Sequence, residues 1–312
     1  MIVAVTPNPA WDVTYRVAEL VPGTSHRVPD VTGRAGGKGV NVARVVRDLG
    51  GDALVVAPVG GLHGQAFTAS LADDGVAARL VATGVELRQS VAVVPEQASG
   101  WDGGHPTLFN ESGEPLPDGV WDGLVATVAE AVGELGPEVV TISGSLPPGT
   151  TENQLAELIG AGRRGGAAVL VDTSGDALVW AARARADLVK PNRTEALGAT
   201  GTGNVHDAAA ALRELGAGAV VITDGGDGMR YDDGATRLTA RLDTELAGNP
   251  TGAGDAALAA LALGWTLPWP ERLRRAVATS AASVTEPVAG RVDADLAASL
   301  LARTDLKEET LA

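Results

Sequence analysis

The chain has 312 residues, which is long for one compact core and short for three, so we expect one large domain with a small appendage. Hydrophobic residues at 45% and charged residues at 20% are typical of a globular protein and exclude a fibrous or disordered chain. The formal net charge of −15 argues against nucleic-acid or anionic-membrane partners, because both need a basic face.

The composition also limits the compartment in which we expect the protein. No cysteine is present, which excludes disulfides and thiolate metal sites and suits a reducing compartment. The start "MIVAVTPNPA" has no basic segment followed by an apolar stretch, so no signal peptide is predicted. The longest apolar run, residues 256–265, is shorter than the ~20 residues of a membrane-spanning helix. We therefore expect a cytoplasmic protein.

Short β-branched runs alternate with helical stretches along most of the chain. The runs that indicate buried strands are "IVAVTPN", "ALVVAPVGG", "EVVTISGS", "AAVLVDTSG", "DLVKPN" and "AVVITDGG". Helices are predicted over residues 38–49, 65–75, 121–135, 152–164, 177–186, 205–216 and 272–285. The alternation predicts a three-layer α/β/α fold with a mostly parallel central sheet. Ligands bind beyond the carboxyl ends of such strands, where the polar ends of these runs gather.

Two stretches interrupt the alternation. Residues 13–31 and 89–110 are rich in valine and threonine and contain no convincing helix, so they predict a small antiparallel sheet outside the main body. The segment "PEQASGWDGGHP" within the second stretch is predicted to be a loop. The C-terminal "KEETLA" is predicted to fray.

The stretch "NPTGAGDAALAALALG", residues 249–264, places glycines and one acid at the start of an apolar helix. Gly252 and Gly254 leave the first backbone N–H groups bare, which favours anion binding. Asp255 lies in the first turn, where a carboxylate can accept the proton of an acceptor hydroxyl, and we expect the helix dipole to keep it ionised. An ordinary helix start with an acidic first turn is the alternative. A dinucleotide fingerprint is disfavoured, because "LAGNP" precedes the turn in place of an early buried strand.

A second glycine turn, "GRAGGKGVNVARVVRDLG", precedes the helix predicted from residue 38. It is not a P-loop, because Gly39 follows Lys38 where serine or threonine is required. A ligand can approach the backbone of Gly36, Gly37 and Gly39, with Lys38 and Asn41 as polar contacts. The alternative is a tight turn with an exposed lysine.

Two further turns combine a structural and a functional interpretation. In "KPNRTEALG", Asn192 and Glu195 have the spacing of a capping box, and they also suit a pair that orders water around a magnesium ion. "TDGGDGMRY", residues 223–231, is either a glycine loop against which a nucleotide lies or a plain hairpin turn.

The order of these turns carries more information than each turn alone. "TPNPAWD", "AGGKGVNVARVVRDLG", "SGSLPPG", "KPNRTE" and "GAGD" occur in this order over nearly the whole chain. The pattern resembles the ribokinase-like (PfkB-type) sugar kinases, and the "TPNPAWD" start and "SGSLPPG" are most similar to the branch with 1-phosphofructokinase and tagatose-6-phosphate kinase.

The resemblance implies a kinase that uses ATP and Mg²⁺ to phosphorylate a ketohexose phosphate, foremost fructose 1-phosphate to fructose 1,6-bisphosphate. Asp255 would be the catalytic base, and the amides of Gly252, Ala253 and Gly254 would form the anion hole. Asn192 and Glu195 would order the Mg²⁺ through water. The residues implied in nucleotide binding are Lys190, Asn192, Thr223, Gly225 and Gly228.

The same resemblance implies a sugar site under a β-sheet lid. Asp12, Gly36, Gly37 and Asn41 would bind the sugar, and the residues near its existing phosphate would be Arg27, Lys38 and Arg88. The lid would comprise about residues 12–32 and 88–110 of a single domain over residues 1–312. It would close over the sugar, exclude water, and form the homodimer interface seen in several family members.

The lid departs from the branch pattern in one motif. The branch has Thr-Arg-x-Asn-x-Lys, whereas "LRQSVA" keeps Arg88 and places Leu87, Ser90 and Ala92 at the other positions. Tagatose 6-phosphate, fructose 6-phosphate, a free sugar and a nucleoside therefore stay open as acceptors. A sugar-phosphate-binding protein without activity is the alternative outside the enzyme class.

Overall fold

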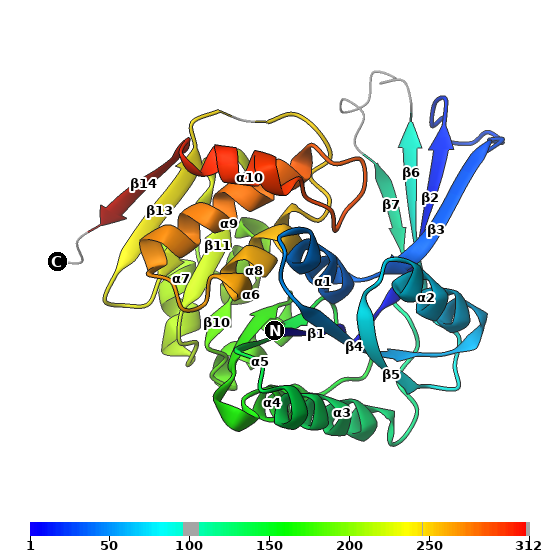
Figure 1. Ribbon diagram of the computed structural model, residues 1–312, viewed down its shortest axis with the longest axis horizontal. Coiled ribbons are helices and arrows are strands. Elements are labelled where there is room, and N and C mark those ends of the chain that lie inside the picture. The colour runs from blue at the N-terminus through cyan, green and yellow to red at the C-terminus, as the bar shows by residue number, and fades with distance from the viewer. Residues whose placement is uncertain (96–105, 245, 310–312) are drawn as a thin grey trace.

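A ten-stranded sheet forms the centre of the computed structural model, which describes residues 1–95, 106–244 and 246–309 (Figure 1). Seven neighbouring strands run parallel, and the last three pair antiparallel at one edge. In spatial order the strands are β5 (Ala77–Ala82), β4 (Ala53–Val59), β1 (Ile2–Val5), β8 (Val139–Ser143), β9 (Ala168–Asp172), β10 (Leu188–Val189), β11 (Val220–Thr223), β12 (Met229–Asp232), β13 (Arg237–Leu242) and β14 (Thr304–Glu309).

Helices cover both faces of this sheet, which confirms the predicted three-layer fold (Figure 1). The helices are α1 (Lys38–Asp48), α2 (Gly61–Asp73), α3 (Val120–Leu135), α4 (Glu152–Gly162), α5 (Asp176–Arg183), α6 (Arg193–Thr200), α7 (Val205–Glu214), α8 (Ala253–Leu263), α9 (Trp269–Val284) and α10 (Ala294–Leu301). Ile2 and Ala4 of β1 belong to the core under α1, α8 and α9, whereas Val3 and Val5 belong to the core under α3, α4 and α7.

The six predicted apolar runs form β1, β4, β8, β9, β10 and β11, so these predictions are confirmed. Every residue of β1, β4, β8 and β9 is buried, because both faces of the parallel sheet are covered. The predicted fraying is wrong for residues 307–309, which pair with β13 as part of β14. Within the described residues, no helix combines the length and apolarity needed to cross a bilayer.

A separate small sheet stands beside the main body, as predicted (Figure 1). Its strands, in spatial order, are β3 (Asp30–Gly36), β2 (Ala10–Val17), β6 (Gln89–Pro95) and β7 (Thr107–Asn110). The sheet is mixed rather than antiparallel, because β2 and β6 pair parallel and the long excursion from α1 to β5 connects them. Most of the predicted loop "PEQASGWDGGHP" lies at residues 96–105, outside the described residues.

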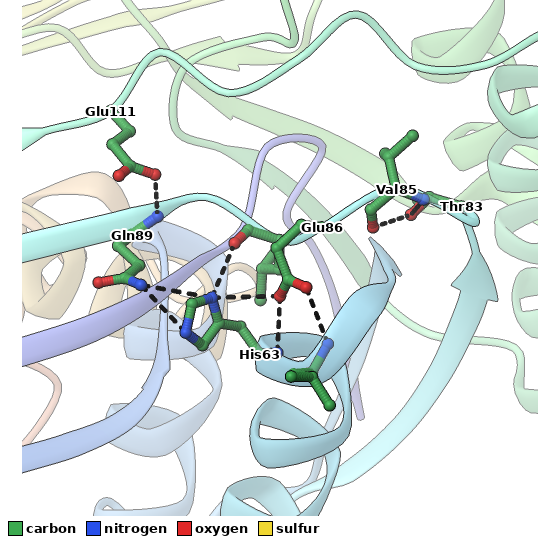
Figure 2. A network of polar contacts seen from close by, with 8 residues as sticks. His63, Thr83, Val85, Glu86, Gln89 and Glu111 are labelled. Carbon is green, nitrogen blue, oxygen red and sulfur yellow. Dashed lines mark hydrogen bonds and ion pairs between the residues drawn. The ribbon is translucent and has the colours of Figure 1, made fainter.

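A polar network joins the start of β6 to helix α2 (Figure 2). The Glu86 carboxylate accepts the N–H of Leu62 at 2.9 Å and that of His63 at 2.7 Å, and these bonds hold the pKa of Glu86 below its usual range. The His63 ring lies 3.0 Å from Gln89 Nε2, and the Gln89 N–H donates to Glu111. The network thus attaches the start of strand β6 in the small sheet to helix α2 of the main body.

Candidate active site

Helix α8 begins at a glycine turn that leaves backbone donors open. Gly252, the N-cap, has a φ of 87°, a value that favours glycine. Among the described residues, the N–H groups of Gly252, Gly254 and Asp255 have no protein acceptor, whereas the Ala253 N–H donates to the Pro250 carbonyl at 3.1 Å. Two of the three predicted anion-hole amides are therefore open to a ligand, and that of Ala253 is already bonded.

Asp255 and Asn41 join the two glycine motifs. Asn41 lies on α1 and Asp255 in the first turn of α8, and both side chains are buried. Asn41 Nδ2 donates to Asp255 Oδ2 at 2.8 Å. This bond connects residues 214 positions apart, so the turns before α1 and α8 border the same site.

Burial raises the pKa of Asp255 to about 7. Lys38, the Asn41 hydrogen bond and Lys190 lower this pKa, while the Asp172 carboxylate raises it further. The expectation that the helix dipole keeps Asp255 fully ionised is therefore wrong, because desolvation outweighs the favourable charges. A carboxyl with a pKa near neutrality is a stronger base than an ordinary aspartate.

An acidic residue absent from the sequence predictions lies between the two lysines of the site. Asp172 lies at the carboxyl end of β9 and is only 1% exposed. Lys38 Nζ lies 2.9 Å from its Oδ1, and Lys190 Nζ lies 2.9 Å from its Oδ2. Burial raises the pKa of Asp172, but the two ammonium groups outweigh it and hold the pKa below its ordinary value. The strand "AAVLVD" ends on this carboxylate, which is the sequence signal that could have identified it.

Asn192 and Glu195 form the capping box that their spacing predicts. Asn192 Oδ1 accepts the Glu195 N–H at 2.9 Å, and Glu195 Oε2 accepts the Asn192 N–H at 2.8 Å. The second oxygen, Glu195 Oε1, lies 3.8 Å from Lys38 Nζ. Helix capping therefore uses one oxygen of Glu195 and leaves the other facing the site.

The predicted nucleotide residues gather at the ends of β10 and β11. Asn192 and Thr223 pair as neighbours in an isolated bridge. A Cβ at Gly254 would lie 3.4 Å from Lys190 Nζ, which places Lys190 beside the start of α8. Gly225 and Gly228 have φ values of 53° and 84° in the following turn. Lys190 thus lies beside the start of α8, and Thr223, Gly225 and Gly228 lie at the carboxyl end of the neighbouring strand β11 and in the turn after it.

Asp12 lies on β2 at the base of the small sheet. A Cβ at Gly36 would lie 2.0 Å from Asp12 Cγ, so only glycine leaves room for this carboxylate. Burial raises the pKa of Asp12 to about 6, against the nearby charges of Arg34, Arg44 and Arg88. Gly37 follows with a φ of 107° and leads directly into α1.

The three predicted phosphate contacts occupy different environments. Lys38 lies in the site against Asp172. Arg88 donates to the backbone carbonyls of Asn8 at 2.9 Å and Glu111 at 2.8 Å. Arg27 is exposed in the connection between β2 and β3. Lys38 is therefore near enough to Asp255 to lower its pKa, whereas Arg88 is bonded to backbone carbonyls and Arg27 is exposed.

Comparisons with known proteins agree with this geometry. The sequence matches the pfkB family of carbohydrate kinases over residues 6–294. It is 29% identical to 1-phosphofructokinase from Escherichia coli K12 over 98% of both chains. It is 34% identical to 1-phosphofructokinase from Xanthomonas campestris pv. campestris over 83% of this chain and 82% of the relative.

Solved structures show the same fold. Phosphofructokinase-2 from Escherichia coli in complex with fructose-6-phosphate is 28% identical, with a TM-score of 0.86 over 96% of this chain and 98% of the other. Its tetrameric inhibited form has a TM-score of 0.87 at the same identity and coverage. Together with the ordered glycine motifs, these similarities show that the chain belongs to the pfkB family of carbohydrate kinases.

Proposed function

We propose that this carbohydrate kinase transfers the γ-phosphoryl group of ATP to fructose 1-phosphate and forms fructose 1,6-bisphosphate. The observation that carries the proposal is the Asn41–Asp255 hydrogen bond, which places a carboxylate of raised pKa beside open helix N–H groups. The choice of acceptor is supported by the relatives named 1-phosphofructokinase.

The chain's residues divide the reaction between positioning and proton transfer. Asp255 accepts the proton of the attacking hydroxyl, and Asn41 orients its carboxylate. The N–H groups of Gly252 and Gly254 donate to oxygens of the migrating phosphoryl group, where charge accumulates. Asp12 binds sugar hydroxyls. A loose transition state needs little covalent assistance, so accurate placement supplies most of the catalysis.

The residues near Glu195 fit a magnesium ion held through water. Mg²⁺ prefers oxygen ligands and keeps several of its waters, so one carboxylate oxygen and phosphate oxygens of the nucleotide can hold it. Glu195 Oε1 is free of the capping box and faces Lys38, so it can accept a hydrogen bond from such a water. The bound ion would neutralise phosphate charge, while Lys190, Thr223, Gly225 and Gly228 would contact the nucleotide.

A coupled ADP-release assay over a panel of acceptors tests the proposal. We expect the highest kcat/KM with fructose 1-phosphate. Fructose 6-phosphate is the second candidate, because the similar phosphofructokinase-2 structure contains it. Preference for tagatose 6-phosphate, a free sugar or a nucleoside would overturn the acceptor. Calorimetric binding without turnover on the whole panel would instead indicate a sugar-phosphate-binding protein.

The pH dependence of activity should report the titration of Asp255. Its pKa of about 7 means that the base is protonated below neutrality and available above it. We therefore expect kcat/KM to fall about tenfold per pH unit below pH 7 and to level off above it. Initial rates in constant-ionic-strength buffers from pH 5 to 9 measure the profile. A flat profile down to pH 5 would contradict the raised pKa.

We also propose that two copies associate through the small sheet. Side chains at paired positions share a sheet face, so Phe109 lies on the face of Val91 and Val13, and Val31 on that of Tyr15. Phe109 is 58% and Val31 56% exposed on this apolar face. Exposed apolar surface of this kind is typical of interfaces between subunits.

Sedimentation velocity tests the predicted homodimer. We expect the parent protein to sediment as a dimer at micromolar concentration and the double variant Val31→Ser/Phe109→Ser as a monomer. Leu62→Ser is the matched control, because Leu62 is 75% exposed and belongs to helix α2 rather than to a strand of the small sheet. A monomeric parent protein, or an equal effect of the control, would contradict this interface.

A cytoplasmic location accords with the proposed use of ATP.

A further inference from the structure

We infer that Arg34, on strand β3 of the small sheet, is a positioning residue that orients Asp255 through the side chain of Asn41. The inference rests on the proposed phosphoryl transfer, in which Asp255 is the base. Arg34 lies in the glycine turn before α1, but the sequence motifs assign it no role. Its role follows from a chain of contacts that begins in the small sheet and ends at the start of α8.

The Asn41 carboxamide is held at both ends. Arg34 Nη2 donates to Asn41 Oδ1 at 3.3 Å, and Asn41 Nδ2 donates to Asp255 Oδ2 at 2.8 Å. A carboxamide turned by 180° would place its oxygen against the carboxylate and its NH₂ group against the guanidinium, which are two repulsive contacts. The guanidinium therefore selects the orientation in which Asn41 donates to Asp255.

Arg34 also holds the turn that packs on both Asn41 and α8. Its Nη2 donates to the Ala289 carbonyl. A Cβ added at Gly290 would lie 2.6 Å from Asn41 Oδ1, and one added at Gly252 would lie 2.8 Å from the Ala289 Cβ. The segment at residues 289–290 thus touches Asn41 and the N-cap of α8 at once. By binding Ala289, Arg34 therefore also holds in place the segment against which the Asn41 carboxamide packs.

The backbone that carries Arg34 is itself fixed. The N–H of the next residue, Ala35, donates to Ser70 Oγ at 3.0 Å, and its carbonyl accepts from Arg44 Nη1 at 2.7 Å. Arg44 is buried and pairs with Asp74 at 2.7 Å. A side chain that projects from such a pinned strand is preorganised, so its contacts cost little further ordering.

Arg34 is a charged hydrogen-bond donor near neutral pH, although its surroundings lower its pKa. Burial lowers the pKa of its guanidinium to about 10, and Arg44 and Arg291 lower it as well, against Asp12 and Asp74. The group remains protonated near neutral pH. Asp12 lies directly opposite in the β2–β3 register. The proposed sugar ligand Asp12 and the proposed base Asp255 therefore share one neighbouring cation, directly or through Asn41.

Steady-state kinetics of Arg34→Met and Arg34→Lys test the inference. With the acceptor that the panel identifies, we expect Arg34→Met to lower kcat roughly 10- to 100-fold, the size of a lost hydrogen bond from a charged donor. The KM for ATP should stay within about twofold. Arg34→Lys should recover part of kcat, because lysine restores a positively charged donor but lacks the planar set of N–H groups of a guanidinium. Arg16→Met is the matched control, since Arg16 lies further along the small sheet and pairs with Asp30 at 3.4 Å in a half-exposed contact.

A double-mutant cycle separates action through Asn41 from other roles. On an Asn41→Ala background, Arg34→Met should change kcat by no more than about twofold. Full additivity of the two losses would overturn the inference, as would a raised acceptor KM with unchanged kcat, which would assign Arg34 to the substrate. A lowered melting temperature with unchanged kcat would indicate a structural role alone and would also overturn it. If the parent protein phosphorylates no acceptor of the panel, the proposed function is wrong. This outcome differs from failure of the Arg34 inference, which is tested only in an active parent protein.

Discussion

Replacing Asp255 with asparagine is expected to lower kcat about 10²- to 10⁴-fold, the range for loss of a general base. The oxygen of the introduced carboxamide can still accept the hydrogen bond from Asn41 Nδ2, so the orientation is kept while the proton acceptor is lost. The N–H groups of Gly252 and Gly254 are untouched. The KM for ATP should therefore change little, and single-turnover measurements should place the loss in the chemical step.

A matched control comes from another helix start. Asp207 also lies in a first helical turn, in α7, and accepts from Asn204 Nδ2 at 2.7 Å, but it is exposed. Asp207→Asn should leave kcat unchanged. Near-parental turnover in Asp255→Asn would refute the assignment of the base and, with it, the mechanism.

The same variant should fold at least as well as the parent protein. A carboxyl whose pKa is higher in the folded state than in the unfolded state destabilises the fold when it is ionised. The pKa of Asp255 is raised to about 7, so at pH 8 the parent carries this cost and Asp255→Asn does not. Thermal melts at pH 8 should show an equal or higher Tm. A lost activity with a retained Tm then reports chemistry rather than unfolding.

The architecture could be predicted from the sequence wherever burial leaves a local pattern. The fully buried strands β1, β4, β8 and β9 are continuous apolar runs in the sequence. The antiparallel edge escapes such a prediction, because "MRYD", "RLTARL" and "TDLKEE" mix charged and apolar residues on alternating faces. Strand β5 is half-exposed and carries no long apolar run, so the sequence does not reveal it either.

The site could be predicted only in part, because its contacts join distant segments. Glycine turns mark where a ligand can approach, and they indicate Asp255, Lys38 and Asn41. Arg34 and Asp172 have no local signature of that kind, because Arg34 also binds the carbonyl of Ala289, 255 residues away, and Asp172 binds Lys38, 134 residues away. The raised pKa of Asp255 has no sequence signal, because desolvation depends on the packing of several elements around it.

Asp172→Asn is expected to lower the free energy of unfolding by about 3–5 kcal/mol, the cost of leaving a buried charge without its partner. The Lys190 side chain is only 3% exposed, and Asp172 provides its counter-ion at 2.9 Å. Lys38 also loses a partner, but its side chain is 37% exposed and reaches water. Urea unfolding should show a lower midpoint at an unchanged m-value, as expected for a change in stability alone.

Two further variants distinguish a buried-charge effect from a general packing defect. Asp243→Asn removes an ion pair with Arg303 in which both side chains are almost half exposed, so it should cost less than about 1 kcal/mol. Asp172→Asn/Lys190→Met removes the stranded ammonium as well, and it should regain most of the lost stability because a buried pair replaced by uncharged groups costs little. If the double variant is as unstable as Asp172→Asn, the lost free energy of unfolding comes from packing. The charge of the Asp172 carboxylate then contributes nothing to the stability of this end of the sheet.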